Sequence, residues 1–236
     1  MLAPAVAEFW RADLDGDVVV ASDAFTLTVA PTGHYRVVSL ERPTGVVRAR
    51  VVEPLAAQLG LRERPVRSAA ALRDRLREHG LELSGPTHVF HVDAAAAAGL
   101  RDAPAPARVR ALTAADADAF AAFHAAASDE DRDEAFVELE HWAVVGAIVD
   151  GRLAAVASAY PWHGSPLADI GVLTLEPFRG RGLARDVVRT MSRTLLERGY
   201  EPLYRCDFDN RASAAVARSA GMERLGTWDA LANDEG

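Results

Sequence analysis

Hydrophobic and polar positions along the chain follow two different periods. Short β-branched runs bounded by polar or glycine-containing turns predict strands, and apolar residues recurring every three or four positions predict amphipathic helices. The first part of the chain therefore predicts four strands, then two helices, then a further strand. In order, they are expected at residues 18–21, 25–29, 35–40, 46–52, 54–59, 68–79 and 87–92.

The segment between residues 94 and 108 interrupts this pattern. It begins with the alanine run Ala94–Ala98 and ends near Pro104-Ala105-Pro106, and prolines resist both helix and sheet. We therefore predict a domain boundary here, with an α+β domain at residues 1–105 and a second domain at residues 106–236. The alanine run itself fits either a linker or a short helix.

The second part of the chain has a clearer order. Thr113 to Asp116 resembles a capping box that starts a helix, and Asp150-Gly151 is a strong hairpin signal between two strands. A strand, a long helix and another strand follow, which predicts a parallel crossover. We thus expect a mixed, mostly antiparallel sheet with helices on both faces. The strands are expected at residues 109–112, 141–149, 153–160, 169–175, 202–208 and 222–231, and the helices at 116–127, 130–138, 183–198 and 212–220.

Composition is that of a globular protein with an acidic second half. Of 236 residues, 50% are hydrophobic and 25% are charged, all 26 basic residues are Arg, and the net charge is −8. Residues 106–236 hold 14 Arg and 21 acidic residues, so this half alone carries a net −7. An acidic balance disfavours nonspecific nucleic-acid binding and favours cationic substrates.

Several function classes are disfavoured by residue content. The single cysteine, Cys206, rules out an internal disulfide and a cysteine-based metal framework. His88 and His91 are three positions apart in a predicted strand, so they point to opposite faces and do not form a shared metal site. The N-terminus lacks the charged region of a signal peptide, and no apolar run reaches the roughly 18 residues that span a bilayer. We expect no metal, no membrane association and a cytoplasmic location.

The run Leu173–Ala184 carries the clearest chemical signal. It passes from a strand, through a turn with Gly180 and Gly182, directly into a helix. The first turn of a helix has unpaired N–H groups and a partial positive charge, and glycines let the backbone approach an anion closely. Arg179 and Arg181 would add charge-assisted contacts. A loop that uses glycine only to bend is the alternative.

Three phosphate-binding signatures compete for this turn. A P-loop needs lysine, which the chain lacks, and the Rossmann fingerprint needs a third glycine where Arg185 stands. The pattern (Arg/Gln)-x-x-Gly-x-(Gly/Ala) fits as Arg179, Gly182 and Ala184. In its strand–turn–helix setting this pattern resembles the GNAT superfamily of N-acetyltransferases. The resemblance covers about residues 109–231 and includes the Asp150-Gly151 hairpin and a last helix marked by Asn210, Ser213 and Gly221.

The resemblance implies a GNAT-like α/β fold in which two parallel strands splay apart where acetyl-CoA binds. The pantetheine arm would bond one strand edge as an added strand, and a backbone N–H there would polarise the thioester carbonyl. For Asn210 a role as helix N-cap is the alternative. The CoA-binding residues implied are Leu173, Thr174, Leu175, Arg179, Gly180, Arg181, Gly182, Leu183, Ala184, Asn210 and Ser213.

The resemblance also implies direct attack by a primary amine on acetyl-CoA in a ternary complex. Asp169 takes the place of the family's glutamate base; it is one methylene shorter, so a bridging water is expected, and a bond to a neighbouring loop is the alternative role. The family's usual tyrosine acid falls at Ala217, which leaves Tyr204, Cys206 and Ser219 as local substitutes. This gap keeps open a second interpretation, a non-catalytic acyl-CoA-binding or sensing module.

The acceptor and the first domain are less constrained. Acidic residues dominate residues 129–140, which fits either an acidic rim for an amine or a solvated helix face. Tyr160 and Trp162 alternate onto one strand face and fit an aromatic pocket wall or ordinary packing. Residues 1–105 lack the Arg/Gly turn and would suit a degenerate copy of the same fold, acting as a lid, a substrate wall or a homodimer surface.

Overall fold

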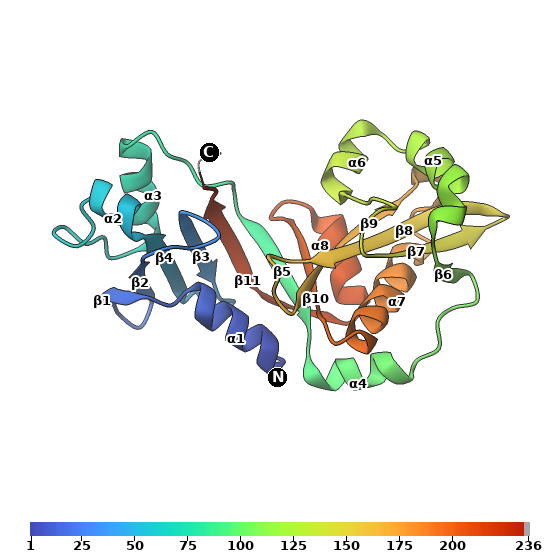
Figure 1. Ribbon diagram of the computed structural model, residues 1–236, viewed down its shortest axis with the longest axis horizontal. Helices are drawn as coiled ribbons and strands as arrows, with labels where there is room; N and C mark the ends of the chain where they lie inside the picture. The colour runs from blue at the N-terminus through green and yellow to red at the C-terminus, as the bar shows by residue number, and fades with distance from the viewer. Residues whose placement is uncertain (234–236) are drawn as a thin grey trace. The chain divides into compact units, whose positions relative to one another are not determined.

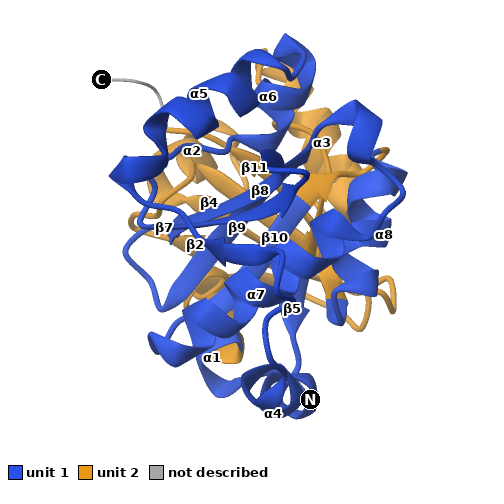
Figure 2. Cartoon of the chain, turned by 90° about the vertical axis from the view of Figure 1, so that its right-hand side faces the viewer, with its two compact units in different colours: residues 1–6, 90–205, 210–223 blue, residues 7–89, 206–209, 224–236 orange. Residues whose placement is uncertain are grey.

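The computed structural model describes residues 1–233, and its internal contacts divide the chain into two compact units (Figure 2). The boundary expected between residues 105 and 106 falls inside unit 1. The chain enters and leaves each unit several times, so no single position in the sequence separates them. Unit 1 consists of residues 1–6, 90–205 and 210–223, and unit 2 of residues 7–89, 206–209 and the described residues from 224 onward.

Unit 2 contains the strands that the alternating pattern of the first part predicts. β1 pairs antiparallel with β2, β2 pairs in parallel with β4, and β4 and β3 pair antiparallel. β11, from the end of the chain, completes this order by pairing antiparallel with β3. The strands are β1 (Asp17–Ala21), β2 (Phe25–Ala30), β3 (Val37–Glu41), β4 (Val47–Val52) and β11 (Met222–Leu231).

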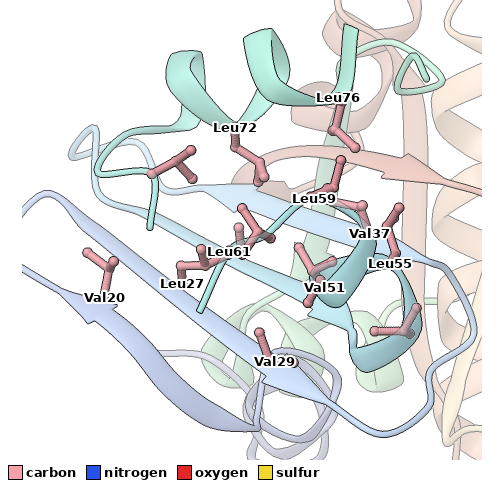
Figure 3. Close-up of a cluster of buried hydrophobic side chains, with 14 of the residues drawn as sticks. Val20, Leu27, Val29, Val37, Val51, Leu55, Leu59, Leu61, Leu72 and Leu76 are labelled. Carbon is pink, nitrogen blue, oxygen red and sulfur yellow. The ribbon is translucent and has the colours of Figure 1, made fainter. Parts of the chain in front are cut away.

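Helices α2 (Glu53–Gln58) and α3 (Ala69–Glu78) pack their apolar residues onto this sheet (Figure 3). The α3 residues Leu72 and Leu76 are one turn apart and both are buried in the core cluster, as the helical period predicts. Ser68 accepts a hydrogen bond from the Ala71 N–H, which confirms it as the N-cap of α3.

Two helices go beyond what the pattern predicts. α1 (Pro4–Asp13) begins with a proline, which is favoured in the first turn, and buries Val6 and Trp10 one turn apart. α4 (Ala94–Asp102) contains the alanine run, and its N-cap Asp93 accepts a hydrogen bond from the Ala96 N–H. The alanine run is therefore a helix.

Unit 1 contains a mixed sheet in the order β5-β10-β9-β8-β7-β6. The pairs β6–β7, β7–β8 and β8–β9 are antiparallel and the pair β9–β10 is parallel, as expected for a hairpin series followed by a crossover. The strands are β5 (Thr87–Val92), β6 (Val109–Ala111), β7 (Ala143–Val149), β8 (Arg152–Pro161), β9 (Leu167–Thr174) and β10 (Glu201–Asp207).

Helices cover both faces of the sheet of unit 1, as predicted. α5 (Ala117–Ala125) and α6 (Asp129–Ala135) lie on one side and α7 (Leu183–Glu197) on the other (Figure 1). Residues 153–159 of β8 are all buried, because a central strand covered on both faces exposes neither set of side chains. The cluster beneath α5 joins Phe120 and Phe123 to Leu173 of β9. α8 (Arg211–Ser219) and two short 3-10 helices, η1 (Ala114–Asp116) and η2 (Glu176–Phe178), complete the unit.

Two local predictions of unit 1 are confirmed. Asp150 and Gly151 both have positive φ, 49° and 76°, as a tight hairpin turn between β7 and β8 requires. Thr113 and Asp116 form the reciprocal bonds of a capping box ahead of α5. Among residues 1–233, no helix is both long enough and apolar enough to cross a membrane.

Candidate active site

The strands β9 and β10 separate part of the way along their length. They pair in parallel from Leu167 and Glu201 as far as Ile170 and Tyr204. β9 then continues to Thr174 and β10 continues to Asp207, with no further register between them. The sheet is therefore split at the carboxyl ends of two parallel strands, a place where ligands bind in open α/β sheets.

The backbone of β9 presents alternate residues to this split. The Leu175 N–H donates to the Ala154 carbonyl on the β8 side, at 3.0 Å. Because successive peptide groups of a strand point to opposite edges, the N–H groups of Val172 and Thr174 face the split instead. The Thr174 carbonyl also faces it and accepts a bond from Arg179 Nε at 3.2 Å.

A cavity of about 250 Å³ lies at the split. Strand register divides its lining residues, because paired residues on neighbouring strands point to the same face of the sheet. Asp169 is level with Tyr160 of β8 and Leu203 of β10, so Asp169, Tyr160 and Arg205 share the face on which α6 lies. Ile170, Val172 and Tyr204 line the opposite face. The complete lining is Glu134, Ala135, Phe136, Tyr160, Asp169, Ile170, Gly171, Val172, Tyr204, Arg205 and Ser213.

Asp169 is the buried acid of the α6 face, with 6% of its surface exposed. Its Oδ2 accepts bonds from Arg205 Nε at 3.0 Å, from Arg205 Nη2 at 2.6 Å and from the Tyr160 hydroxyl at 3.4 Å. Its Oδ1 is buried and has no hydrogen-bond partner among the described residues. Burial in this setting raises the pKa of Tyr160, and the negative charge of Asp169 adds to the effect, so the phenol stays a hydrogen-bond donor.

A pair of hydroxyl groups lines the opposite face. The Tyr204 hydroxyl lies 2.7 Å from Ser213 Oγ, at the start of α8. Asn210 is the N-cap of α8, because its Oδ1 accepts a bond from the Ser213 N–H at 2.9 Å. Of the other residues considered as proton donors, Ser219 bonds its own helix at the Val216 carbonyl. Cys206 is buried, forms no disulfide and lies outside the cavity lining.

The Arg/Gly turn forms a backbone cradle ahead of α7. Gly180 and Gly182 both have φ of 74°, a left-handed conformation that glycine adopts without strain. The first hydrogen bond within α7 runs from the Asp186 N–H to the Gly182 carbonyl. The N–H groups of Leu183 and Ala184 precede this bond in the chain, so they lie in the first turn, at the positive end of a 15-residue helix. This is a geometry that binds phosphate.

The two arginines of the turn are engaged differently. Arg179 Nη2 lies 2.6 Å from Asp131 Oδ1 of α6. The Arg181 guanidinium lies 5.3 Å from the centre of the Phe178 ring. Arg181 is exposed, whereas Arg179 joins the turn to α6.

The carboxyl end of α6 packs closely against β9. A Cβ added at Gly171 would lie 2.2 Å from the Ala135 carbonyl oxygen, so only glycine permits this approach. Phe136 then ends the helix with φ of 44° and ψ of 55°, a conformation that costs a bulky residue energy. Glu134 Oε2 accepts a bond from Asn210 Nδ2 at 3.1 Å. Together these contacts hold the end of α6 at the cavity.

The structure brings some of the residues singled out from the sequence together at the cavity and places others elsewhere. Asp169 and Ser213 line the same cavity, and Tyr160 forms part of its wall, whereas Trp162 packs beneath Arg205 at 5.1 Å. Arg205 was missed, although a charged residue inside an otherwise apolar strand signals a buried partner. The β9 residues whose N–H groups face the split are Val172 and Thr174. Leu173 and Leu175 instead point their N–H groups toward β8 and their side chains into the core.

No group of three or more His, Cys, Asp or Glu side chains among residues 1–233 is arranged to hold a metal ion. A split between parallel strands, a cavity at the split and a backbone cradle at the next helix are features that suit an extended, phosphate-bearing ligand. The family model described as GNAT acetyltransferase matches residues 112–231, half of the chain. The chain therefore belongs to the GNAT acetyltransferase family, and its C-terminal part has the fold that the sequence predicts.

Solved structures of related fold come from several bacteria. A GNAT-family protein from Novosphingobium aromaticivorans DSM 12444 is 23% identical, with a TM-score of 0.48 and coverage of 63% of this chain and 65% of its own. An acetyltransferase of the family from Colwellia psychrerythraea is 15% identical, with a TM-score of 0.46 and coverage of 64% and 57%. The chain thus spans less than two thirds of the length of each of these two proteins.

A conserved protein of unknown function from Staphylococcus epidermidis ATCC 12228 matches along almost the whole length. It is 10% identical, with a TM-score of 0.50, and the match covers 96% of this chain and 97% of the other. At this identity the likeness is one of fold alone. No curated protein gives a significant match to the chain.

Proposed function

We propose that the protein is an N-acetyltransferase that moves an acetyl group from acetyl-CoA to a primary amine in a ternary complex. The observation that carries the proposal is the cavity at the split between β9 and β10. It holds an acid, Asp169, on one face of the sheet and a hydroxyl pair, Tyr204 and Ser213, on the other. An amine and a thioester that meet in the split would have a proton acceptor and a proton donor on opposite sides.

Acetyl-CoA would bind with its pyrophosphate on the N–H groups of the Gly180–Ala184 cradle and with Arg179 beside it. Its pantetheine arm would bond the edge of β9 at Val172 and Thr174, the residues whose N–H groups face the split. Thr174 Oγ1 is buried without a hydrogen-bond partner among the described residues, which supports a ligand at this edge. Leu183, at the first position of α7, contributes its N–H while its side chain is buried.

The reaction would use groups already at the cavity. Asp169, through Oδ1 or a bridging water, takes a proton from the ammonium, and the neutral amine attacks the thioester carbonyl carbon. A β9 backbone N–H stabilises the oxyanion as the C–N bond forms. The C–S bond then breaks, and the leaving thiolate takes a proton from the Tyr204–Ser213 pair. The amine nitrogen loses its second proton to water, and solvent returns a proton to the hydroxyl pair and takes the first proton from Asp169. The products are an N-acetyl amine and CoA.

A non-catalytic acyl-CoA-binding or sensing module is the second candidate. It is favoured by Ala217, which stands where the family places its usual acid and is fully buried. Calorimetric titration with acetyl-CoA, followed by a thiol-release assay over a panel of amines, separates the two. Binding together with turnover supports the enzyme, binding without any turnover supports the sensor, and no binding contradicts both.

Two variants test the assigned roles. Asp169→Asn is expected to lower kcat by about 10²–10⁴-fold, the contribution typical of general-base catalysis, while acetyl-CoA binding is retained. Tyr204→Phe combined with Ser213→Ala is expected to slow transfer from acetyl-CoA more than transfer from a thioester whose thiol is more acidic, since a better leaving group needs no proton. Near-normal turnover in Asp169→Asn would remove that residue from the mechanism.

A further inference from the structure

The α6 face of the cavity is more negative than positive. Its charged side chains are Glu134 and Asp169, which are acids, and Arg205, while Tyr160 is neutral. Two nitrogens of Arg205 already bond Asp169 Oδ2, and its guanidinium lies 5.1 Å from the centre of the Trp162 ring. The charge of Arg205 is thus balanced within the site, and one negative charge remains.

One buried oxygen on this face has no donor. Asp169 Oδ1 has no hydrogen-bond partner among the described residues, although only 6% of the residue surface is exposed. Leaving a buried carboxylate oxygen without a donor costs free energy, so this position favours a ligand that supplies an N–H group. A positively charged N–H donor would also balance the remaining charge.

The neighbouring wall is aromatic. The rings of Phe136, Tyr160 and His141 lie against one another. The centre of the Phe136 ring is 5.8 Å from that of Tyr160, in an edge-on arrangement, and 5.1 Å from that of His141. The ring centres of His141 and Tyr160 are 5.0 Å apart. Phe136 is 53% exposed and is held here by the left-handed end of α6 and the close approach at Gly171. Aromatic faces attract an ammonium group and offer apolar surface to the body of its carrier.

We propose that the acceptor is a small primary amine with one positive charge, an apolar body and no carboxylate beside the amine. The proposal rests on the proposed function, since it names the substrate class of the same site. The cavity volume of about 250 Å³ is small, because pockets for drug-sized ligands are roughly 300–1,000 Å³. A carboxylate on the carbon next to the amine would stand beside Asp169 and Glu134, where like charges repel and Arg205 is already engaged.

Binding to the CoA-saturated protein tests the proposal without depending on turnover. Calorimetric titrations with tyramine and with tyrosine compare two molecules that differ only by the carboxylate. Tyramine is expected to bind at least about tenfold more tightly than tyrosine, since the repelled charge lies in a partly buried site. Equal affinities, tighter binding of tyrosine, or no binding of tyramine would overturn the proposal, with the second outcome pointing to carboxylate recognition by Arg205.

A matched pair of variants locates the effect. Glu134→Gln keeps the hydrogen-bond acceptor for Asn210 but removes the charge, and it is expected to weaken tyramine binding. Glu130→Gln makes the same change elsewhere on α6, outside the cavity lining, and should leave tyramine binding unchanged. Equal effects of the two variants would contradict a local role. If tyramine binds preferentially but is not acetylated, the proposed function fails and the amine site stands; if amines are acetylated but tyrosine binds as tightly, this inference fails alone.

Discussion

Asp131 of α6 holds the guanidinium of Arg179, and we predict that it competes with the CoA pyrophosphate for that group. The two side chains lie 2.6 Å apart and are 34% and 50% exposed, respectively. Exposed ion pairs of this kind are worth about 0.2–1 kcal/mol. Replacing Asp131 by Asn removes the competing charge, so CoA should bind about 1.4- to 5-fold more tightly, as follows from the same free energies.

Calorimetric titration with CoA measures this change. Asp133→Asn is the matched control, because Asp133 is exposed on the same helix and its replacement alters the net charge equally. The difference in CoA affinity between the two variants should decrease at high salt, where exposed charges are screened. Weaker CoA binding in Asp131→Asn would refute the reasoning and show that Asp131 orients Arg179 for phosphate. An equal gain in both variants would assign the effect to overall charge.

Three further predictions concern backbone geometry and pH. Gly171→Ala should lower the free energy of unfolding by about 1–3 kcal/mol in urea titrations, because its Cβ would lie 2.2 Å from the Ala135 carbonyl. Gly182→Ala, at φ of 74°, should both lower stability and weaken CoA binding, whereas Gly45→Ala, at φ of 82°, should lower stability alone. Burial lowers the pKa of His141 below the ordinary value of 6.5. The stability that the neutral imidazole contributes is therefore full above pH 6.5 and is lost as the pH falls below 6.5. His141→Asn should flatten this decline in the free energy of unfolding, measured by urea titrations over a pH series.

For each of these three predictions, one experimental result would contradict it. A fully stable Gly171→Ala protein would mean that α6 shifts away from β9 at no cost. CoA binding unchanged in Gly182→Ala would mean that the cradle does not hold the pyrophosphate. An unaltered pH dependence in the His141 variant would show that other groups cause the acid loss of stability.

Local structure was predictable wherever a short run of residues suffices to specify it. The Asp150-Gly151 turn needs two residues that tolerate positive φ, and the chain supplies them between two apolar runs. The Ser68 cap and the Thr113–Asp116 capping box likewise depend on residues at most three apart. The Gly180–Ala184 cradle belongs to the same class, because a strand, two glycines and a helix start follow directly along the chain. α1 escaped prediction since its buried stripe is only Val6 and Trp10.

Tertiary structure decided what depends on residues distant in sequence. Arg205 and Asp169 are 36 positions apart, and only the parallel register of β9 and β10 brings them into contact. The same register ends at Ile170 and Tyr204, and this opens the split, which no hydrophobic pattern marks.

The tertiary structure also decides which β9 residues face the split. They are Val172 and Thr174, and not Leu173 and Leu175. This follows from which edge of β9 bonds to β8, a fact that side-chain alternation alone leaves undetermined. The sequence by itself therefore determined the local elements and the glycine turn that precedes α7, because short-range sterics and hydrogen bonding suffice for these. The cavity and its charges were decided by long-range strand pairing.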